Sequence, residues 1–122
     1  MSPTALITGA SQGIGRATAL LFAKNNYNLI ITARTKDKLE AVADEIRSLD
    51  RQVLAITTDV SDRTAVSSLI DLGIERFQAI DVLVNNAGIC MTAPMAKTTL
   101  EDWEKIINVN LWGYIYTINS LL

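Results

Sequence analysis

A chain of 122 residues is long enough for one domain with a sizeable core, and a hydrophobic content of 49% is high for that length. Its formal net charge is -2, with Lys and Arg scattered among Asp and Glu, so neither nucleic acid nor a membrane is an expected partner. There is no histidine and one cysteine, Cys90, which excludes a Ser-His-Asp triad, an internal disulfide and a metal site built from Cys or His. We expect Cys90 to be a small buried residue rather than a nucleophile.

The first predicted unit is a strand, a glycine-rich turn and a helix. The apolar run of residues 4–7 predicts a buried strand, and apolar residues recur at helical spacing after Gly15. The segment between them reads Thr-Gly-Ala-Ser-Gln-Gly-Ile-Gly over residues 8–15. We expect Gly9 to take the tight turn, Gly13 to let an anion approach the backbone, and Gly15 to pack the helix closely on the strand. The alternative is a glycine-rich connection that binds no ligand.

Two further strand and helix pairs follow the first. Residues 28–33 predict the second strand and residues 53–57 the third, with apolar residues at helical spacing after each. Thr35 is placed to cap the helix after the second strand. After the third strand, Ser61 is the expected N-cap and Asp62 suits the first helical turn.

The fourth predicted strand, residues 81–85, runs into Asn-Ala-Gly. Thr98 and Glu101 have the spacing of a capping box and predict the start of a final helix, whose apolar residues occupy more than one stripe. Such a helix packs on the sheet with one side and on another subunit or domain with the other, and we expect a homo-oligomer through residues 100–122. Gly73, in the helix before the fourth strand, is expected to cause a bend or fraying.

The alternation of four strands with helices predicts a parallel sheet with right-handed crossovers. The expected fold is therefore α/β, a Rossmann-like doubly wound parallel sheet, with residues 1–122 as a single, partial dinucleotide-binding domain that is truncated after the helix following strand 4. In such a sheet a ligand lies at the carboxyl ends of the strands, near the point where the strand order reverses. All four predicted strand ends carry unusual residues: Thr8 to Gly15, Ala33-Arg34, Asp59-Val60 and Asn85 to Gly88.

With those four strand ends in view, the sequence resembles the N-terminal half of the short-chain dehydrogenase/reductase family, over essentially the whole chain. The matching motifs are Thr8 to Gly15 (Thr-Gly-x3-Gly-x-Gly), Asp59-Val60, Asn85-Asn86-Ala87-Gly88 and Asn108-Val109-Asn110. The resemblance implies an oxidoreductase that moves a hydride between a nicotinamide cofactor and the carbonyl or alcohol carbon of a small-molecule substrate.

The resemblance also implies where the cofactor lies. Asp59 and Val60 are expected to contact the adenine, with a simple helix-entry acid as the alternative role of Asp59. Asn85 is expected to be structural, its amide tying neighbouring strands together. The pyrophosphate is expected on the glycine turn and the ribose side on the fourth strand end, which together comprise Gly9, Ser11, Gln12, Gly13, Ile14, Gly15, Asn86, Ala87 and Gly88.

Arg34 favours NADP(H) over NAD(H) as the cofactor. An enzyme that uses NAD places Asp or Glu at the end of the second strand, where it bonds the ribose 2'-hydroxyl. This chain has Ala33 there, followed by Arg34, whose planar guanidinium suits a 2'-phosphate. Relatives that prefer NADP often carry a second basic residue where this chain has Gln12, and a solvated surface charge is the alternative for Arg34.

Of the Asn, Ser, Tyr and Lys that form the active site of the family, Asn110 matches the first, at a place where its side chain interrupts the helix and holds a water. In the family the Tyr exchanges the proton and the Lys, four residues later, stabilises the Tyr anion. No tyrosine of this sequence is followed by Lys at that spacing.

We therefore expect the cofactor-binding half of a reductase, truncated and inactive alone. The alternative is a non-catalytic nucleotide-binding or protein-interaction module. The N-terminus passes directly into the first strand without a secretion signal, so a cytoplasmic location is expected.

Overall fold

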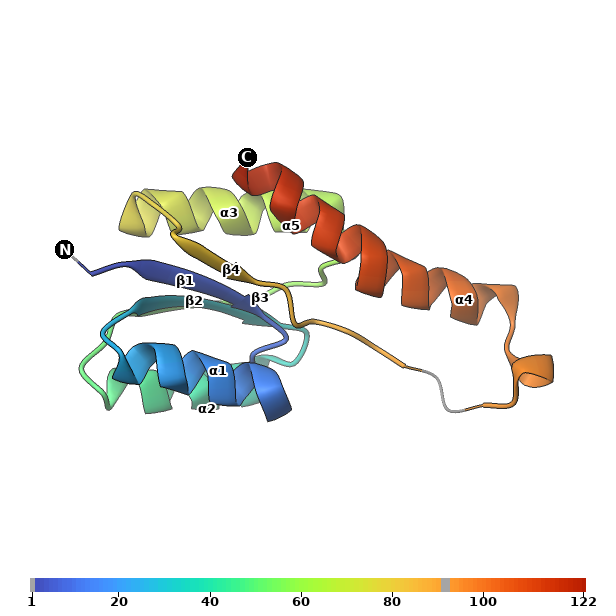
Figure 1. Cartoon of the computed structure of the whole chain (residues 1–122), viewed down its shortest axis with the longest axis horizontal. Coiled ribbons are helices and arrows are strands. Elements are labelled where there is room, and N and C mark those ends of the chain that lie inside the picture. Colours follow the sequence, from blue (N-terminus) through green and yellow to red (C-terminus); the bar gives the residue numbers. More distant parts are fainter. Residues whose placement is uncertain (1, 91–92) are drawn as a thin grey trace.

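The computed structural model describes residues 2–90 and 93–122 and shows a parallel sheet with helices on both faces (Figure 1). The elements in chain order are β1 (Thr4–Thr8), α1 (Gly13–Lys24), β2 (Asn28–Ala33), α2 (Lys36–Arg47), β3 (Val53–Thr57), α3 (Arg63–Phe77), β4 (Val82–Val84), the 3-10 turn η1 (Met95–Lys97), α4 (Leu100–Ile107), the π-helical turn η2 (Asn108–Trp112) and α5 (Gly113–Leu121).

The four strands lie in the order β3-β2-β1-β4 and all pair in parallel. The strand order therefore reverses at β1, from which the chain moves outward first to β2 and β3 and then to β4 on the other side. In Figure 1, α1 and α2 cover one face of the sheet, and α3 and α5 cover the other. The predicted α/β Rossmann-like fold is confirmed.

Burial on both faces explains why the central strands β1 and β2 are continuous apolar runs. Ile7 and Ile31 pack with the buried residues of α1 and α2, whereas Leu6 and Ile30 pack with Leu69 of α3. All four strand residues have no exposed surface. Each contributes about 1.5–3 kcal/mol by leaving water, so the two faces together hold the central strands in place.

Two predicted helix caps are wrong by one residue. The N-cap of α3 is Asp62, which accepts a hydrogen bond from the Ala65 backbone N–H at 3.1 Å, while Ser61 instead donates its hydroxyl to Asp59. An aspartate two residues before a serine captures that serine in a local turn, which leaves the cap to the next residue.

The capping box of α4 is formed by Thr99 and Asp102 instead of Thr98 and Glu101. The sequence holds both Thr-x-x-acid patterns, offset by one position. Thr98 donates its hydroxyl to the Pro94 carbonyl and belongs to the preceding turn. That contact decides between the two patterns.

Gly73 and Cys90 also differ from the predictions. Helix α3 runs unbroken through Gly73, which is buried. A Cβ at this position would lie only 2.5 Å from Ile30 Cδ1 of β2. The glycine therefore lets α3 approach β2 closely. Cys90 is exposed rather than buried and lies outside the sheet, between β4 and η1.

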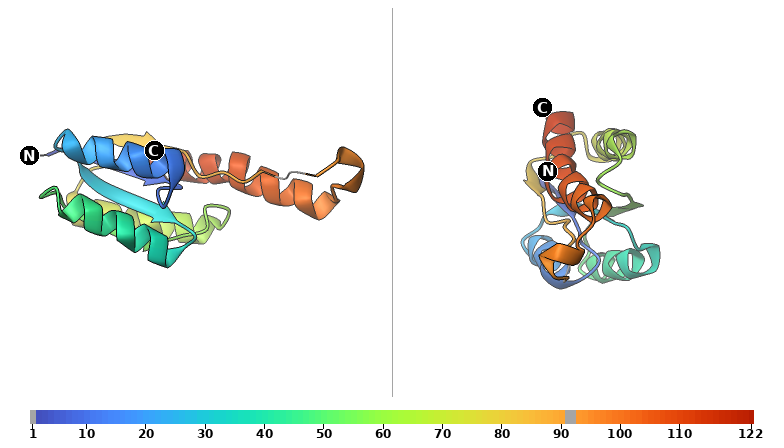
Figure 2. Two further views of the ribbon diagram at one scale, coloured as in Figure 1. Left: turned by 90° about the horizontal axis from the view of Figure 1, so that it is seen from below. Right: turned by 90° about the vertical axis from the view of Figure 1, so that its right-hand side faces the viewer.

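Helix α4 lies beyond the end of the sheet and has no buried residue (Figures 1 and 2). Helix α5 continues in nearly the same direction and reaches back over α3. In the described part of the chain, no helix is long and apolar enough to cross a membrane. Large apolar side chains remain exposed along α4, η2 and α5: Leu100, Trp103, Ile107, Leu111, Trp112, Ile115 and Ile118.

Candidate functional site

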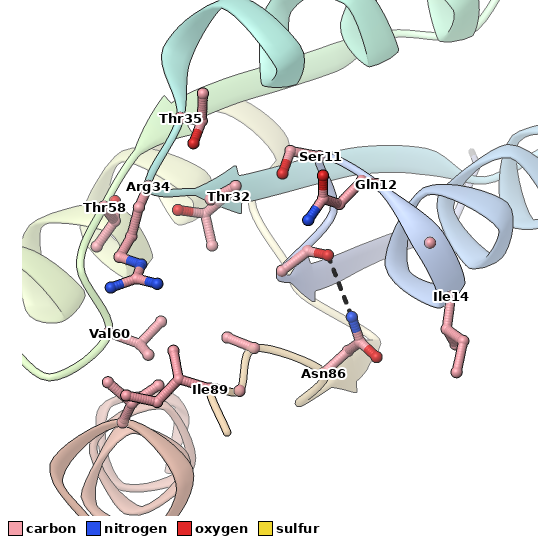
Figure 3. Close-up of a pocket in the computed structure, with 16 residues that line it drawn as sticks. Ser11, Gln12, Ile14, Thr32, Arg34, Thr35, Thr58, Val60, Asn86 and Ile89 are labelled. Carbon is pink, nitrogen blue, oxygen red and sulfur yellow. Dashed lines mark hydrogen bonds between the residues drawn. The ribbon is translucent and has the colours of Figure 1, made fainter. Parts of the chain in front are cut away.

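A pocket of about 370 Å³ lies at the carboxyl ends of the four strands (Figure 3). Residues that follow each of the strands line it, so it spans the position where the strand order reverses. Of the residues predicted to hold a cofactor, it brings together Gly9, Ser11, Gln12, Gly13, Ile14, Arg34, Val60, Asn86, Ala87 and Gly88. Gly15 and Asp59 are not among its lining residues.

The glycine turn has the conformation that its sequence predicts. Gly9 has φ 64° and Gly13 has φ 58°, in the left-handed region. A Cβ at Gly9 would lie 2.9 Å from Ala87 Cα, and a Cβ at Gly13 would meet no atom within 4 Å. Gly15 packs against the Gly9 carbonyl rather than against the strand, so the helix is held close to the turn itself.

A buried threonine joins the glycine turn to the end of β4. Thr8 has no exposed surface, and its Oγ1 accepts hydrogen bonds at 3.0 Å from the backbone N–H groups of both Asn86 and Ala87. The Asn86 side chain donates from Nδ2 to the Gly9 carbonyl at 3.1 Å (Figure 3). These three bonds hold the end of β1 to the end of β4, although the two lie 77 to 79 positions apart in the sequence. The sequence places Thr8 at the end of a buried strand and at the first position of the glycine motif, but neither feature predicts its hydrogen bonds to the end of β4.

Asn85 ties the sheet to a helix instead of tying neighbouring strands, which corrects the prediction. The Thr117 hydroxyl of α5, which is buried, donates to Asn85 Oδ1 at 2.7 Å. β4 is an edge strand of the sheet in the described chain, so no strand lies on its outer side. The Asn85 carboxamide therefore finds its partner on α5. This bond fixes α5 over the end of β4.

The end of β2 supplies the positive charge of the pocket. Arg34 is exposed, and its guanidinium extends into the open space of the pocket (Figure 3). It is the one charged residue among those that line the pocket, and no carboxylate lines it within the described residues. Thr35 is the N-cap of α2 as predicted, but its side chain makes no capping hydrogen bond and lines the pocket. The electrostatics of this wall favour an anion.

Asp59 and Val60, which follow β3, have different environments. Val60 is 5% exposed and lines the pocket. The Asp59 carboxylate accepts hydrogen bonds from the Ser61 backbone N–H at 3.0 Å and from the Ser61 hydroxyl at 2.7 Å. Asp59 thus shapes the entry to α3, and its contact with an adenine stays a prediction.

Asn110 lies within the π-helical turn η2, so the predicted interruption of the final helix is there. Its Oδ1 accepts from the Ile89 N–H at 2.9 Å, and its Nδ2 donates to the Ile89 carbonyl at 2.8 Å. Ile89 and Val109 both line the pocket, although no motif in the sequence predicts either as a site residue. The carboxamide therefore holds the pocket wall and keeps one N–H and one lone pair for a water.

The described residues contain no group of three or more His, Cys, Asp or Glu side chains that could hold a metal ion. Among the described residues, the pocket wall combines one guanidinium and small polar side chains with the apolar side chains of Ile14, Ala33, Val60, Ala87, Ile89 and Val109.

Comparison with known proteins places these features in one family. The sequence model of the short chain dehydrogenase family matches residues 3–122. A 3-oxoacyl-(acyl-carrier-protein) reductase FabG of Staphylococcus aureus is 40% identical over 121 residues, which are 98% of this chain and 49% of that protein. The chain thus spans about half the length of the relatives it matches.

Similar folds are found among solved structures, including two that contain a nicotinamide cofactor or its derivative. An alcohol dehydrogenase from Thermococcus sibiricus complexed with 5-hydroxy-NADP has a TM-score of 0.94 and 34% identity, with 99% of this chain and 52% of that chain covered. A short chain dehydrogenase/reductase from Burkholderia phymatum in complex with NAD has a TM-score of 0.94 and 29% identity, with 98% and 42% covered. With its fold, its glycine turn and these matches, the chain belongs to the short chain dehydrogenase family.

Proposed function

We propose that this chain is the cofactor-binding half of an NADP(H)-dependent reductase that transfers a hydride between the nicotinamide and a carbonyl or alcohol carbon of a small molecule. The observation that carries the proposal is the pocket at the strand-order reversal, where Arg34 is the one charged residue among the described residues of the lining. Relatives of similar structure were solved with NAD in one case and an NADP derivative in the other, so the family accommodates both cofactors.

The start of α1 suits the pyrophosphate. The helix begins at Gly13, its N-cap Gln12 makes no side-chain capping bond, and its first turn has no acidic residue. The first N–H groups therefore remain for an anion at the positive end of the helix. Gly13 leaves open space above them, which favours close approach of a phosphate.

We assign the remaining lining residues to the two nucleoside parts of the cofactor. Val60 offers an apolar surface for the adenine, and Asn86, Ala87 and Gly88 line the path towards the nicotinamide ribose. The backbone N–H groups of Asn86 and Ala87 are already bonded to Thr8, so they hold the wall in shape and do not contact the ligand. The cofactor itself supplies the hydride.

We propose that Arg34 binds the 2'-phosphate that distinguishes NADP from NAD. Within the described residues the guanidinium forms no salt bridge, so its charge is available to a ligand. Ala33, at the place where a carboxylate would bond a ribose 2'-hydroxyl, offers no competing acceptor.

Asn110 is the catalytic residue that this sequence contributes under the proposal. Its two hydrogen bonds with Ile89, which lines the pocket, support a positioning role within the site. The sequence contains no Tyr-x-x-x-Lys, and a carboxamide does not titrate in the useful range, so acid-base catalysis falls to residues outside these 122.

A homo-oligomer through residues 100–122 and a cytoplasmic location complete the proposal. The apolar side chains exposed on α4 and α5 support the first. Cys90, the one cysteine, needs no oxidising compartment, which fits the second.

The test is a calorimetric titration of the 122-residue protein with NADPH and with NADH, followed by a turnover assay with a panel of carbonyl compounds. We expect NADPH to bind more tightly and no carbonyl reduction to occur. If neither dinucleotide binds, the proposed cofactor site is wrong. Robust turnover by the pure protein would contradict the assignment of catalysis to residues outside the sequence.

A further inference from the structure

Lys38 reaches from α2 to the glycine turn. Its Nζ donates to Gln12 Oε1 at 3.1 Å, and Gln12 lines the pocket. Lys38 is the third residue of α2, which starts three residues after the end of β2. The ammonium group is therefore held at the edge of the pocket by an uncharged amide.

The start of α2 is unusually rich in positive charge. Lys36 and Lys38 are two of its first three residues, and Arg34 lies just before it. Cations are unfavourable at the amino end of a helix, where the macrodipole is positive. Asp37 is the one acid among these residues, so the segment keeps a net positive charge next to the pocket.

Neighbouring cations differ in whether a carboxylate neutralises them. Arg16, in the first turns of α1, is bound by Glu45 through two hydrogen bonds of 3.0 and 2.6 Å. Arg34 and Lys38 form no salt bridge among the residues that the structure describes. Arg16 already joins α1 to α2, so Lys38 is not needed as the sole link between these helices, and its charge is left for another anion.

We infer that Lys38, oriented by Gln12, is a second cation that binds the 2'-phosphate of the cofactor together with Arg34. This inference rests on the proposed function, since it names a specificity-determining residue of the same site. This role of Lys38 also explains how a site without a basic residue at position 12 can bind a 2'-phosphate. Lys38 of α2 places an ammonium group next to Gln12, at the edge of the glycine turn. A neutral amide suits this role, since it accepts from the ammonium without cancelling its charge.

The test compares adenosine 2',5'-bisphosphate with 5'-AMP, two probes that differ only in the 2'-phosphate, by calorimetry on the 122-residue protein. We expect the bisphosphate to bind more tightly, and Lys38→Met to reduce its affinity about tenfold while 5'-AMP binding is unchanged. Lys36→Met removes the same charge from the same helical turn and is the matched control, with an expected change of less than about twofold.

A rescue variant separates charge from structure. Adding Gln12→Arg to Lys38→Met restores a cation at the turn and is expected to recover most of the lost affinity for the bisphosphate. If Lys38 only holds α2 against the turn, Lys38→Met will instead lower the melting temperature and weaken both nucleotides equally. An unchanged affinity ratio in Lys38→Met overturns the Lys38 assignment. Failure of NADPH, NADH and both probes to bind overturns the proposed cofactor site itself.

Discussion

The carboxamide of Asn110 makes two hydrogen bonds with a single residue, Ile89: it accepts from the N–H at 2.9 Å and donates to the carbonyl at 2.8 Å. The two residues lie 21 positions apart, one in the π-helical turn and one in the segment after β4. One side chain therefore fixes the backbone that leaves the sheet and forms part of the pocket wall.

Removing this contact should loosen that segment. We expect Asn110→Ala to reduce the free energy of unfolding by about 1–3 kcal/mol, since two hydrogen bonds are lost, and to remove hydrogen-exchange protection at the Ile89 amide. Asn110→Asp keeps an acceptor oxygen and should retain protection there. Asn119, an exposed asparagine of α5, is the control, and its change to Ala should cost less than about 0.5 kcal/mol. Protection of Ile89 that survives in Asn110→Ala would contradict the positioning role.

Thr8 should be more important for stability than its neighbour on β2. Thr8→Val keeps the shape but leaves the N–H groups of Asn86 and Ala87 without their acceptor, at about 1–3 kcal/mol each. Thr32, the register partner of Thr8, donates one hydrogen bond to the Ile56 carbonyl, so Thr32→Val should cost about 1 kcal/mol. Urea unfolding of both variants measures the difference, and equal losses would show that Thr8 does not hold β4 to the turn.

Arg34 should decide the order of cofactor affinities. Arg34→Asp replaces a cation by a carboxylate that repels a 2'-phosphate and can accept from a ribose 2'-hydroxyl. We expect NADPH affinity to fall by about 10- to 100-fold and NADH to become the preferred ligand, as followed by fluorescence titration. Arg47→Asp makes the same charge change in the last turn of α2 and should leave the preference unchanged. An NADPH preference that persists in Arg34→Asp would refute the role of Arg34.

The apolar surface of α4 and α5 should mediate self-association. Leu111 is 54% exposed on the segment between these helices, and Leu111→Glu should convert an oligomer into a monomer in sedimentation velocity, because a charge is costly in an apolar interface. Leu21 is 61% exposed on α1, and Leu21→Glu is the control that should leave the oligomer intact. A wild-type protein that sediments as a monomer across the micromolar range would contradict the interface.

Much of the fold follows from short-range patterns. Strands buried on both faces must be continuous apolar runs, and helices must repeat their apolar residues every three or four positions, so both kinds of element could be predicted from the sequence. Gly9 and Gly13 could be predicted for the same reason, since a left-handed backbone favours glycine wherever the turn lies in the fold. The pattern places the caps at Ser61 and Thr98, one residue too early in each case, because adjacent residues offer the same chemistry.

The order of elements, the glycine turn, the positive charge after β2 and the family could all be inferred from the order of residues along the chain. The pairs of side chains that meet around the pocket become evident only once the chain is folded: Thr8 with the end of β4, Lys38 with Gln12, and Asn110 with Ile89. Each of these contacts joins residues more than twenty positions apart, so it depends on strand order, register and the approach of two helices. Local propensity carries no information about such distances, which arise when the two faces of the sheet are packed.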